Sequence, residues 1–106
     1  MRQSYIRTFV FEDGHSEVLD IEWEIGGGTE VHDHGVSHGV IQVLAGKLTE
    51  VREDGSIHHY RPGDIFHEYP NLKHKVTNTG NCIARSRHHY TPPLTEKSIK
   101  QARGKK

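Results

Sequence analysis

Turn-forming glycines recur along this chain at intervals that leave little room for helices. Asp13-Gly14 and Asp54-Gly55 each supply the positive φ angles that tight hairpins require. Ala45-Gly46 and the Arg-Pro-Gly-Asp run at residues 61–64 also have the composition of turns. The spacing of these turns predicts an all-β fold, either a sandwich or a closed barrel of short strands.

The segments between the turns carry the residues that strands prefer. Residues 18–25 alternate, with Leu19, Ile21, Trp23 and Ile25 on one face and acidic side chains on the other. A period of two is typical of a half-buried strand. The expected strands, about eight or nine in all, cover residues 5–11, 18–25, 39–44, 47–52, 57–60, 65–69, 73–78 and 83–90.

Length, charge and cysteine content limit the organisation and the partners. A chain of 106 residues forms one domain. Lys+Arg and Asp+Glu number 14 each, so no global charge attracts nucleic acid or a membrane surface. The chain has no apolar run near the ~18 residues of a membrane span and no signal-peptide core after Met1. With Cys82 as its single cysteine, the sequence predicts a cytoplasmic protein without an intrachain disulfide.

The composition changes after Pro92-Pro93. Residues 94–106 have few apolar side chains, and their basic residues are Lys97, Lys100, Arg103, Lys105 and Lys106. We expect a single domain over residues 1–93, followed by a basic tail that is a short helix or disordered. Because so small a domain has a modest core, we also expect it to be stabilised by a partner subunit, as a homodimer, or by a bound metal.

His32 and His34 carry the most specific chemistry in the sequence. Side chains two residues apart on an extended strand point to the same face. The two imidazoles can therefore bind one ion, and His74 from a distant strand can complete the set. Imidazole is the commonest protein ligand for zinc, copper, iron and nickel. The alternative is a surface cluster in a chain with 10 histidines, but the surrounding glycines and strands favour a metal site.

Two motifs resemble those of the cupin superfamily. In order along the chain they contain a glycine-rich turn, His32-Asp33-His34, Gly46, Gly63-Asp64, Pro70, His74 and Asn78. Cupins are small conical β-barrels of the double-stranded β-helix or jelly-roll type, and they hold a metal between the two motifs. Most cupins have a glutamate shortly after the second histidine, where this chain has His38 and Gly39.

The chain more closely resembles the cysteine dioxygenase (thiol dioxygenase) group, which uses three histidines and no carboxylate. The resemblance covers residues 5–93, with matching segments at residues 5–7, 23, 28, 32–50, 74–78 and 86–93. Members of that group are usually longer, so the pocket here would be more open or completed by another subunit. Some animal members have, at the position of Gly39, a cysteine crosslinked to the tyrosine that matches Tyr90. The glycine here makes the chain similar to the bacterial-type members.

The resemblance implies a non-haem Fe(II) enzyme. It would add both atoms of dioxygen to the sulfur of cysteine or a related small thiol to give a sulfinic acid. The implied ligands are His32, His34 and His74, with His38 either a fourth ligand or a neighbour of the site. Such a site also accepts nickel, zinc or manganese. The expected partners are the small thiol and dioxygen, with no nucleic acid and no membrane.

Arg7 is the expected anchor for a substrate carboxylate. A planar guanidinium binds a carboxylate through two parallel hydrogen bonds. The alternative is an arginine at the rim, paired with Glu22 or Glu24. The resemblance places Tyr5 and Trp23 with Arg7 in the substrate-binding set.

Ser86, His88 and Tyr90 occupy alternate positions of one predicted strand and so face the same side. We expect a hydrogen-bond relay in which Ser86 orients His88, and His88 orients the Tyr90 hydroxyl toward the metal-bound ligands. This order does not suit a serine nucleophile. Asp33, between two ligands, is expected to accept a hydrogen bond or to support the local structure.

Two other functions remain open. The first is a metal-dependent lyase or isomerase that uses His32, His34, His38 and His74. The second is a small non-catalytic cupin that binds a metal or ligand and acts as a sensor. The row at residues 86–90 and Arg7 favour the thiol dioxygenase.

Overall fold

The computed structural model describes residues 5–94, which form eight β-strands. The strands are β1 (Tyr5–Glu12), β2 (Glu17–Trp23), β3 (His38–Ala45), β4 (Leu48–Arg52), β5 (Ile57–Tyr60), β6 (Ile65–Glu68), β7 (His74–Asn78) and β8 (Ala84–Thr91). These strands correspond to the expected segments within one or two residues at most ends. The prediction of an all-β fold is therefore confirmed.

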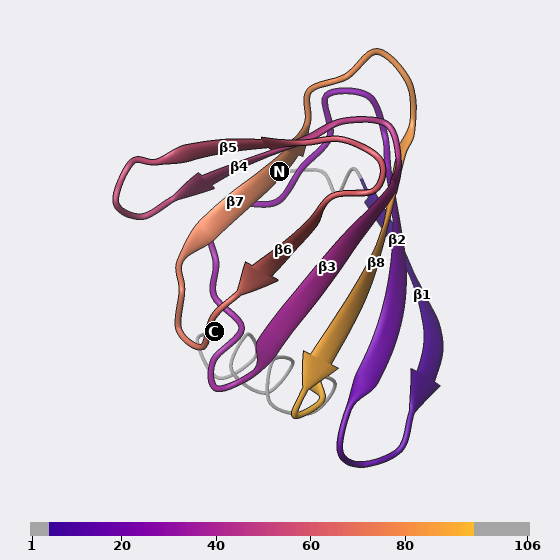
Figure 1. The fold of residues 1–106 in the computed structure, drawn as a ribbon, viewed down its shortest axis with the longest axis vertical. Helices are drawn as coiled ribbons and strands as arrows, with labels where there is room; N and C mark the ends of the chain where they lie inside the picture. The colour runs from indigo at the N-terminus through magenta and orange to yellow at the C-terminus, as the bar shows by residue number, and fades with distance from the viewer. Residues whose placement is uncertain (1–4, 95–106) are drawn as a thin grey trace.

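The strands form two antiparallel sheets (Figure 1). The larger sheet has the order β1-β2-β8-β3-β6, and the smaller sheet has the order β5-β4-β7. The last strand, β8, pairs with both β2 and β3, so its inward side chains reach the centre of the larger sheet. Both sheets contribute to one apolar core, which contains Ile21, Trp23, Ile41, Val43, Leu48, Phe66, Val76 and Ala84.

The alternation predicted for residues 18–25 holds only as far as Trp23. Leu19, Ile21 and Trp23 are buried as expected, whereas Ile25 is 61% exposed. The reason is that β2 ends at Trp23 and the chain turns at Gly26, whose φ of 75° is in the left-handed region. The prediction that Ile25 continues the buried face is therefore wrong.

Residues 24–37, between β2 and β3, run beside β7. Gly28 forms an isolated bridge with Thr77, and His32 forms another with His74. A Cβ on Gly28 would lie 2.5 Å from the carbonyl oxygen of Val76, so this close approach requires glycine. His32 and His34 were expected on a strand, but they lie in this irregular segment, which is attached to β7 by single bridges.

Leu94 belongs to the packed domain although the sequence groups it with the basic tail. Its side chain is buried in a small cluster with Leu19 and Tyr90. Residues 95–106, the rest of the predicted tail, lie outside the described residues. Within residues 5–94, no helical segment has the length and apolarity needed to cross a membrane.

Candidate metal centre

His32, His34 and His74 lie together, as the sequence predicted. One ring nitrogen of each lies within 4.8 Å of those of the other two. The backbone brings them together, because His32 and His74 exchange two N–H···O=C hydrogen bonds of 2.9 Å each. The turn that follows, in which the Asp33 carboxylate accepts the Gly35 N–H at 2.8 Å, positions His34 beside them. Asp33 thus has the structural role expected for it.

Hydrogen bonds orient two of the three imidazoles. Nδ1 of His32 lies 2.7 Å from the carbonyl oxygen of Glu30, and Nδ1 of His74 lies 2.7 Å from Oε2 of Glu50. Both partners are acceptors, so each Nδ1 carries the proton and each Nε2 presents a lone pair. Partners of this kind fix the tautomer of metal-binding histidines in proteins.

Several nitrogens of this cluster have no hydrogen-bond partner. Among the described residues, the buried side-chain atoms in this state are Nδ1 and Nε2 of His34 and Nε2 of His74. Buried polar atoms are almost always paired, so unpaired nitrogens gathered in one place need another partner. Burial also lowers the pKa of His32, which favours the neutral imidazole that a metal requires. These donors fit a transition-metal ion.

Glu50 belongs to the candidate metal centre but was not predicted from the sequence. Its side chain is fully buried, and it also accepts hydrogen bonds from the Tyr60 hydroxyl at 2.9 Å and Arg52 Nε at 3.2 Å. Burial opposes ionisation of Glu50, but the hydrogen bonds from His74 and Tyr60 outweigh it and lower its pKa. The available signal was an acidic residue on the same face of a predicted strand as Leu48.

Glu68, at the end of β6, is a second residue that the sequence analysis missed. Its Oε1 lies 2.9 Å from Nε2 of His34, and its Oε2 lies 3.3 Å from Nε2 of His74. Burial opposes ionisation here too, but contact with His34 and the electrostatic effect of the nearby histidines lower the pKa of Glu68 to about 2. Glu68 alternates with buried Phe66, and that was the only signal for it in the sequence.

The predicted row along β8 is present, and all three side chains are buried. Ser86 Oγ lies 2.6 Å from Nε2 of His88, and Nδ1 of His88 lies 3.0 Å from the Tyr90 hydroxyl. The Trp23 indole N–H donates to Ser86 Oγ at 2.9 Å. Two residues that alternate with this row form ion pairs, Arg85 with Glu22 and Arg87 with Asp20.

The donors and acceptors along this row follow from the hydrogen bond at its Tyr90 end. The Tyr90 hydroxyl donates to Oε1 of Glu68 at 3.0 Å, and an ionised carboxylate can only accept. That bond uses the one hydroxyl proton of Tyr90, so Nδ1 of His88 must donate to Tyr90 and Nε2 must accept from Ser86. Burial lowers the pKa of His88 to about 4, which keeps the ring neutral as this arrangement requires. The Tyr90 hydroxyl therefore points to Glu68, a carboxylate that the sequence analysis did not include.

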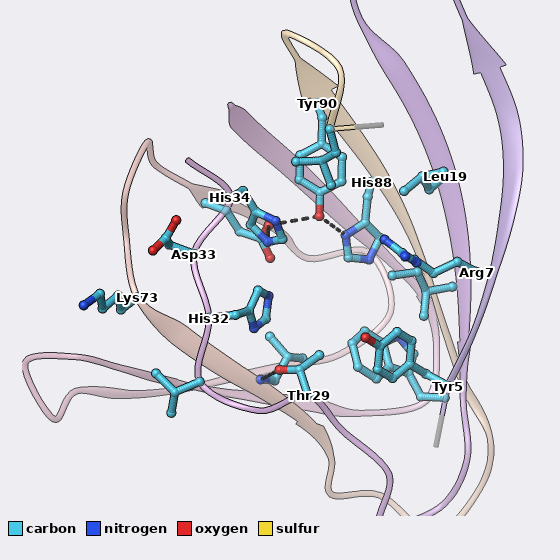
Figure 2. A pocket seen from close by; sticks show the side chains of 16 residues that line it. Tyr5, Arg7, Leu19, Thr29, His32, Asp33, His34, Lys73, His88 and Tyr90 are labelled. Carbon is cyan, nitrogen blue, oxygen red and sulfur yellow. Dashed lines mark hydrogen bonds and ion pairs between the residues drawn. The ribbon is translucent and has the colours of Figure 1, made fainter. Parts of the chain in front are cut away.

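One cavity of about 570 Å³ is lined by His32, His34, Glu68, His88 and Tyr90. Figure 2 shows His32 and His34 on one side of it, Arg7 and Tyr5 of β1 on the opposite side, and Tyr90 between them. The structure thus places Arg7, an exposed residue of β1, on the wall of the cavity that His32 and His34 also line. Glu22, the alternative partner of Arg7, lies 3.2 Å from Arg85.

Trp23 and Tyr5 also line the cavity. Their ring centroids are 5.2 Å apart, and Trp23 is buried in the core with its N–H bonded to Ser86. In the structure Trp23 supports the β8 row as well as the cavity wall.

The structure does not bring His38 to the cluster. Its Nε2 lies 3.0 Å from Nδ1 of His67, and its ring stacks on Tyr69 with centroids 5.4 Å apart. Along β3, the next residue, Gly39, is buried on the cavity side, so His38 faces the other way.

Comparison with known proteins identifies the architecture. A family model described as "Cupin domain" matches residues 19–86. A Klebsiella pneumoniae protein with a double-stranded β-helix domain superposes with a TM-score of 0.77 and 24% sequence identity, over 84% of this chain and 77% of that one. The cupin domain of Cnp3 from Schizosaccharomyces pombe gives a TM-score of 0.79 and 14% identity, over 97% and 73%. KdgF from Halomonas sp. gives 0.77 and 16%, over 86% and 82%. At these identities, the solved structures show a shared fold.

Proposed function

The chain belongs to the cupin family, and from this premise we propose that it is an iron-dependent dioxygenase of small thiols. The observation that carries the proposal is the composition of a single cavity. It is lined by His32 and His34, by Arg7 and by Tyr90, and the buried ring of His74 lies beside the histidine pair. A small substrate with a thiol and a carboxylate has one group for each side of this cavity.

His32, His34 and His74 would hold the ion, which we propose to be Fe(II). A bound ferrous ion supplies a centre that lowers the pKa of a thiol and activates dioxygen. The overall reaction converts RSH and O₂ to RSO₂H, with two S–O bonds formed and the O–O bond broken. Sulfur loses four electrons and dioxygen gains four, so the reaction needs no external reductant.

The protein's own residues would bind and orient the thiol. The Arg7 guanidinium would pair with the substrate carboxylate, and this interaction would fix the distance between the carboxylate and the histidine cluster. Leu19, Ile21 and Val76 line the cavity with apolar surface that limits water near the reacting sulfur. The Tyr90 hydroxyl, held by His88, faces the same space from β8.

The test is direct. Protein reconstituted anaerobically with Fe(II) is mixed with small thiols, oxygen is admitted, and oxygen uptake and sulfinate are measured by electrode and mass spectrometry. We expect sulfinate to form in proportion to oxygen consumed, and His34→Ala to abolish both. Absence of oxygen uptake with every thiol would overturn the proposal.

A second candidate, a metal-dependent lyase or isomerase, is favoured by Glu68. An ionised carboxylate beside the ion would occupy a position that a bidentate thiol and dioxygen together would need. Such an enzyme would use the three histidines and Glu68, without His38. It would convert small carboxylate-bearing substrates anaerobically when loaded with manganese, nickel or zinc. Ligand binding without any turnover would instead support the non-catalytic sensor.

A further inference from the structure

Glu68 contacts the histidine cluster in a way that its hydrogen bonds do not explain. Its side chain is 3% exposed and enters the site from β6, whereas the histidines come from the 24–37 segment and β7. One oxygen faces His34 and the other faces His74. Among the described residues, the hydrogen bond that this carboxylate accepts with suitable geometry comes from the Tyr90 hydroxyl.

The contact between Glu68 and His74 needs a positive charge between them. Nδ1 of His74 donates to Glu50, so Nε2 presents a lone pair toward Oε2 of Glu68 at 3.3 Å. When the imidazole is neutral, as a metal ligand must be, these are two lone pairs that repel each other at this distance. Nε2 of His34 lies 2.9 Å from Oε1 and likewise has no partner with hydrogen-bond geometry. A cation that both residues bind removes the repulsion.

The distances agree with those between ligands of one ion. Nitrogen and oxygen ligands lie about 2.1 Å from a bound transition metal. Two such ligand atoms are then about 3.0 Å apart at a right angle and about 3.4 Å apart at a tetrahedral angle. The separations from Glu68 to His34 and His74 are 2.9 and 3.3 Å.

We propose that Glu68 is the fourth protein ligand of the metal, together with His32, His34 and His74. The inference rests on the metal site of the proposed function. The carboxylate is supplied across the sheet, because Glu68 pairs in register with Gly39 of β3, the strand that follows the histidine pair. A Cβ on Gly39 would lie 3.1 Å from Oε1 of Glu68 and 2.6 Å from Cε1 of Tyr90, so the glycine leaves room for both side chains.

The fourth ligand changes what the site can bind. With three neutral imidazoles and one carboxylate, a divalent ion keeps a net charge of +1. An octahedral ion would have two further positions, enough for a thiol bound through its sulfur alone and one dioxygen. Carboxylate oxygen is a hard donor, so the set favours Fe(II), Mn(II) or Zn(II) over soft Cu(I). A thiol that binds the ion through sulfur alone and reaches Arg7 with its carboxylate fits this arrangement.

The test uses metal binding and no turnover. Co(II) affinity is measured by calorimetry for the full-length wild type and for Glu68→Gln, His34→Ala and Glu53→Gln. Glu53→Gln is the matched control, because it makes the same change of side chain at an exposed position outside the cavity lining. We expect Co(II) affinity to fall at least tenfold in Glu68→Gln, to fall further in His34→Ala, and to change less than threefold in the control.

A direct structural measurement on the wild type separates a ligand from a neighbouring hydrogen-bond partner. In crystals soaked with Co(II), we expect a Glu68 oxygen within about 2.3 Å of the ion. An ion bound by the three histidines with both Glu68 oxygens beyond 3 Å would overturn the inference and leave the metal site intact. Unchanged Co(II) affinity in His34→Ala would instead show that His34 does not bind the metal. That result would contradict the metal site itself, and with it the proposed function. The crystal measurement needs no variant, so it holds even if Glu68→Gln folds poorly.

Discussion

Gly39 of β3 lies between Glu68 of β6 and Tyr90 of β8, in register with both. The missing side chain leaves the space that the Tyr90 ring and the Glu68 carboxylate occupy, since a Cβ would come within 2.6 Å of the ring. Packed interiors do not accommodate an added methyl group without displacement of their neighbours. One glycine thus allows the row of Ser86, His88 and Tyr90 to meet the candidate metal centre.

Gly39→Ala should therefore destabilise the protein, although alanine normally favours folding by restricting the unfolded chain. We expect the free energy of unfolding of the metal-free protein to fall by about 1–3 kcal/mol, measured by urea denaturation. Gln42→Ala, at an exposed position of the same strand, is the control and should change stability little. A variant as stable as the wild type would show that the Tyr90 ring has room to move.

Glu50→Gln should weaken metal binding although Glu50 is not expected to touch the ion. The variant loses the ionised acceptor that holds the proton on Nδ1 of His74 and directs Nε2 into the site. The usual cost of such a loss is about 10- to 100-fold in metal affinity. Co(II) calorimetry measures it, with Glu53→Gln, at an exposed neighbouring position, as the control. Equal affinities would mean that His74 is held by packing alone.

His88 should exist as the tautomer with the proton on Nδ1. This follows from the chain of donors that begins at the Trp23 indole and ends at the Glu68 carboxylate. Nitrogen-15 NMR of the imidazole distinguishes the two forms in the metal-free protein at neutral pH. A proton on Nε2 would mean that Tyr90 donates to His88 and not to Glu68.

Tyr90→Phe should lower both stability and turnover. It leaves the Nδ1–H of buried His88 without an acceptor, which costs about 1–3 kcal/mol. It also removes the hydroxyl from the cavity, so we expect kcat to fall by about one to two orders of magnitude with KM changed less. The rates are compared at matched iron content. If Tyr90→Phe turns over at the wild-type rate, the β8 row contributes to packing and not to catalysis.

Arg7→Ala should discriminate between thiols. We expect KM to rise about 10- to 100-fold for a thiol that carries a carboxylate, since a charge-assisted hydrogen bond contributes about 1.5–3 kcal/mol. Cysteamine, which has no carboxylate, should be affected far less. Equal losses with both thiols would restrict Arg7 to a structural role.

The metal-free protein should lose stability as the pH falls below about 6.5. The pKa of His88 is about 4 in the folded state against 6.5 for a free histidine, so the unfolded chain binds a proton that the folded state excludes. Protonation of His88 does not affect the free energy of unfolding above pH 6.5. The full loss of this free energy, on the order of 3 kcal/mol, is reached near pH 4.

Glu68 extends this acid sensitivity. Its pKa is about 2 in the folded state against 4.5, so it stabilises the protein above pH 4.5, and that contribution is lost toward pH 2. Urea unfolding at a series of pH values measures both effects. His88→Gln should flatten the slope between pH 6.5 and 4, whereas His89→Gln on the exposed face of β8 should not. If the dependence of unfolding free energy on pH is unchanged in His88→Gln, another group causes the loss of stability in acid.

The sequence alone determined those features that depend on neighbours along the chain. The strand positions follow from apolar alternation and from glycines that adopt positive φ, as at Gly14 and Gly55. The row from Ser86 to Tyr90 follows from the same period of two. His32 and His34 were identifiable as a pair by their spacing, although the segment that carries them is not a regular strand.

Only the tertiary structure decided which strands lie beside one another. Alternation shows that Glu50 and Glu68 share a face with buried residues, but it does not show what they meet there. The pairing of β3 with β6 places Glu68 against His34 and Tyr90, and the pairing of β4 with β7 places Glu50 beside His74. Sheet order and register arise from long-range packing, because one face of each strand must be buried against partners distant in sequence. For the same reason His38, a metal candidate by sequence position, pairs with His67 on the opposite face of β3 from Gly39.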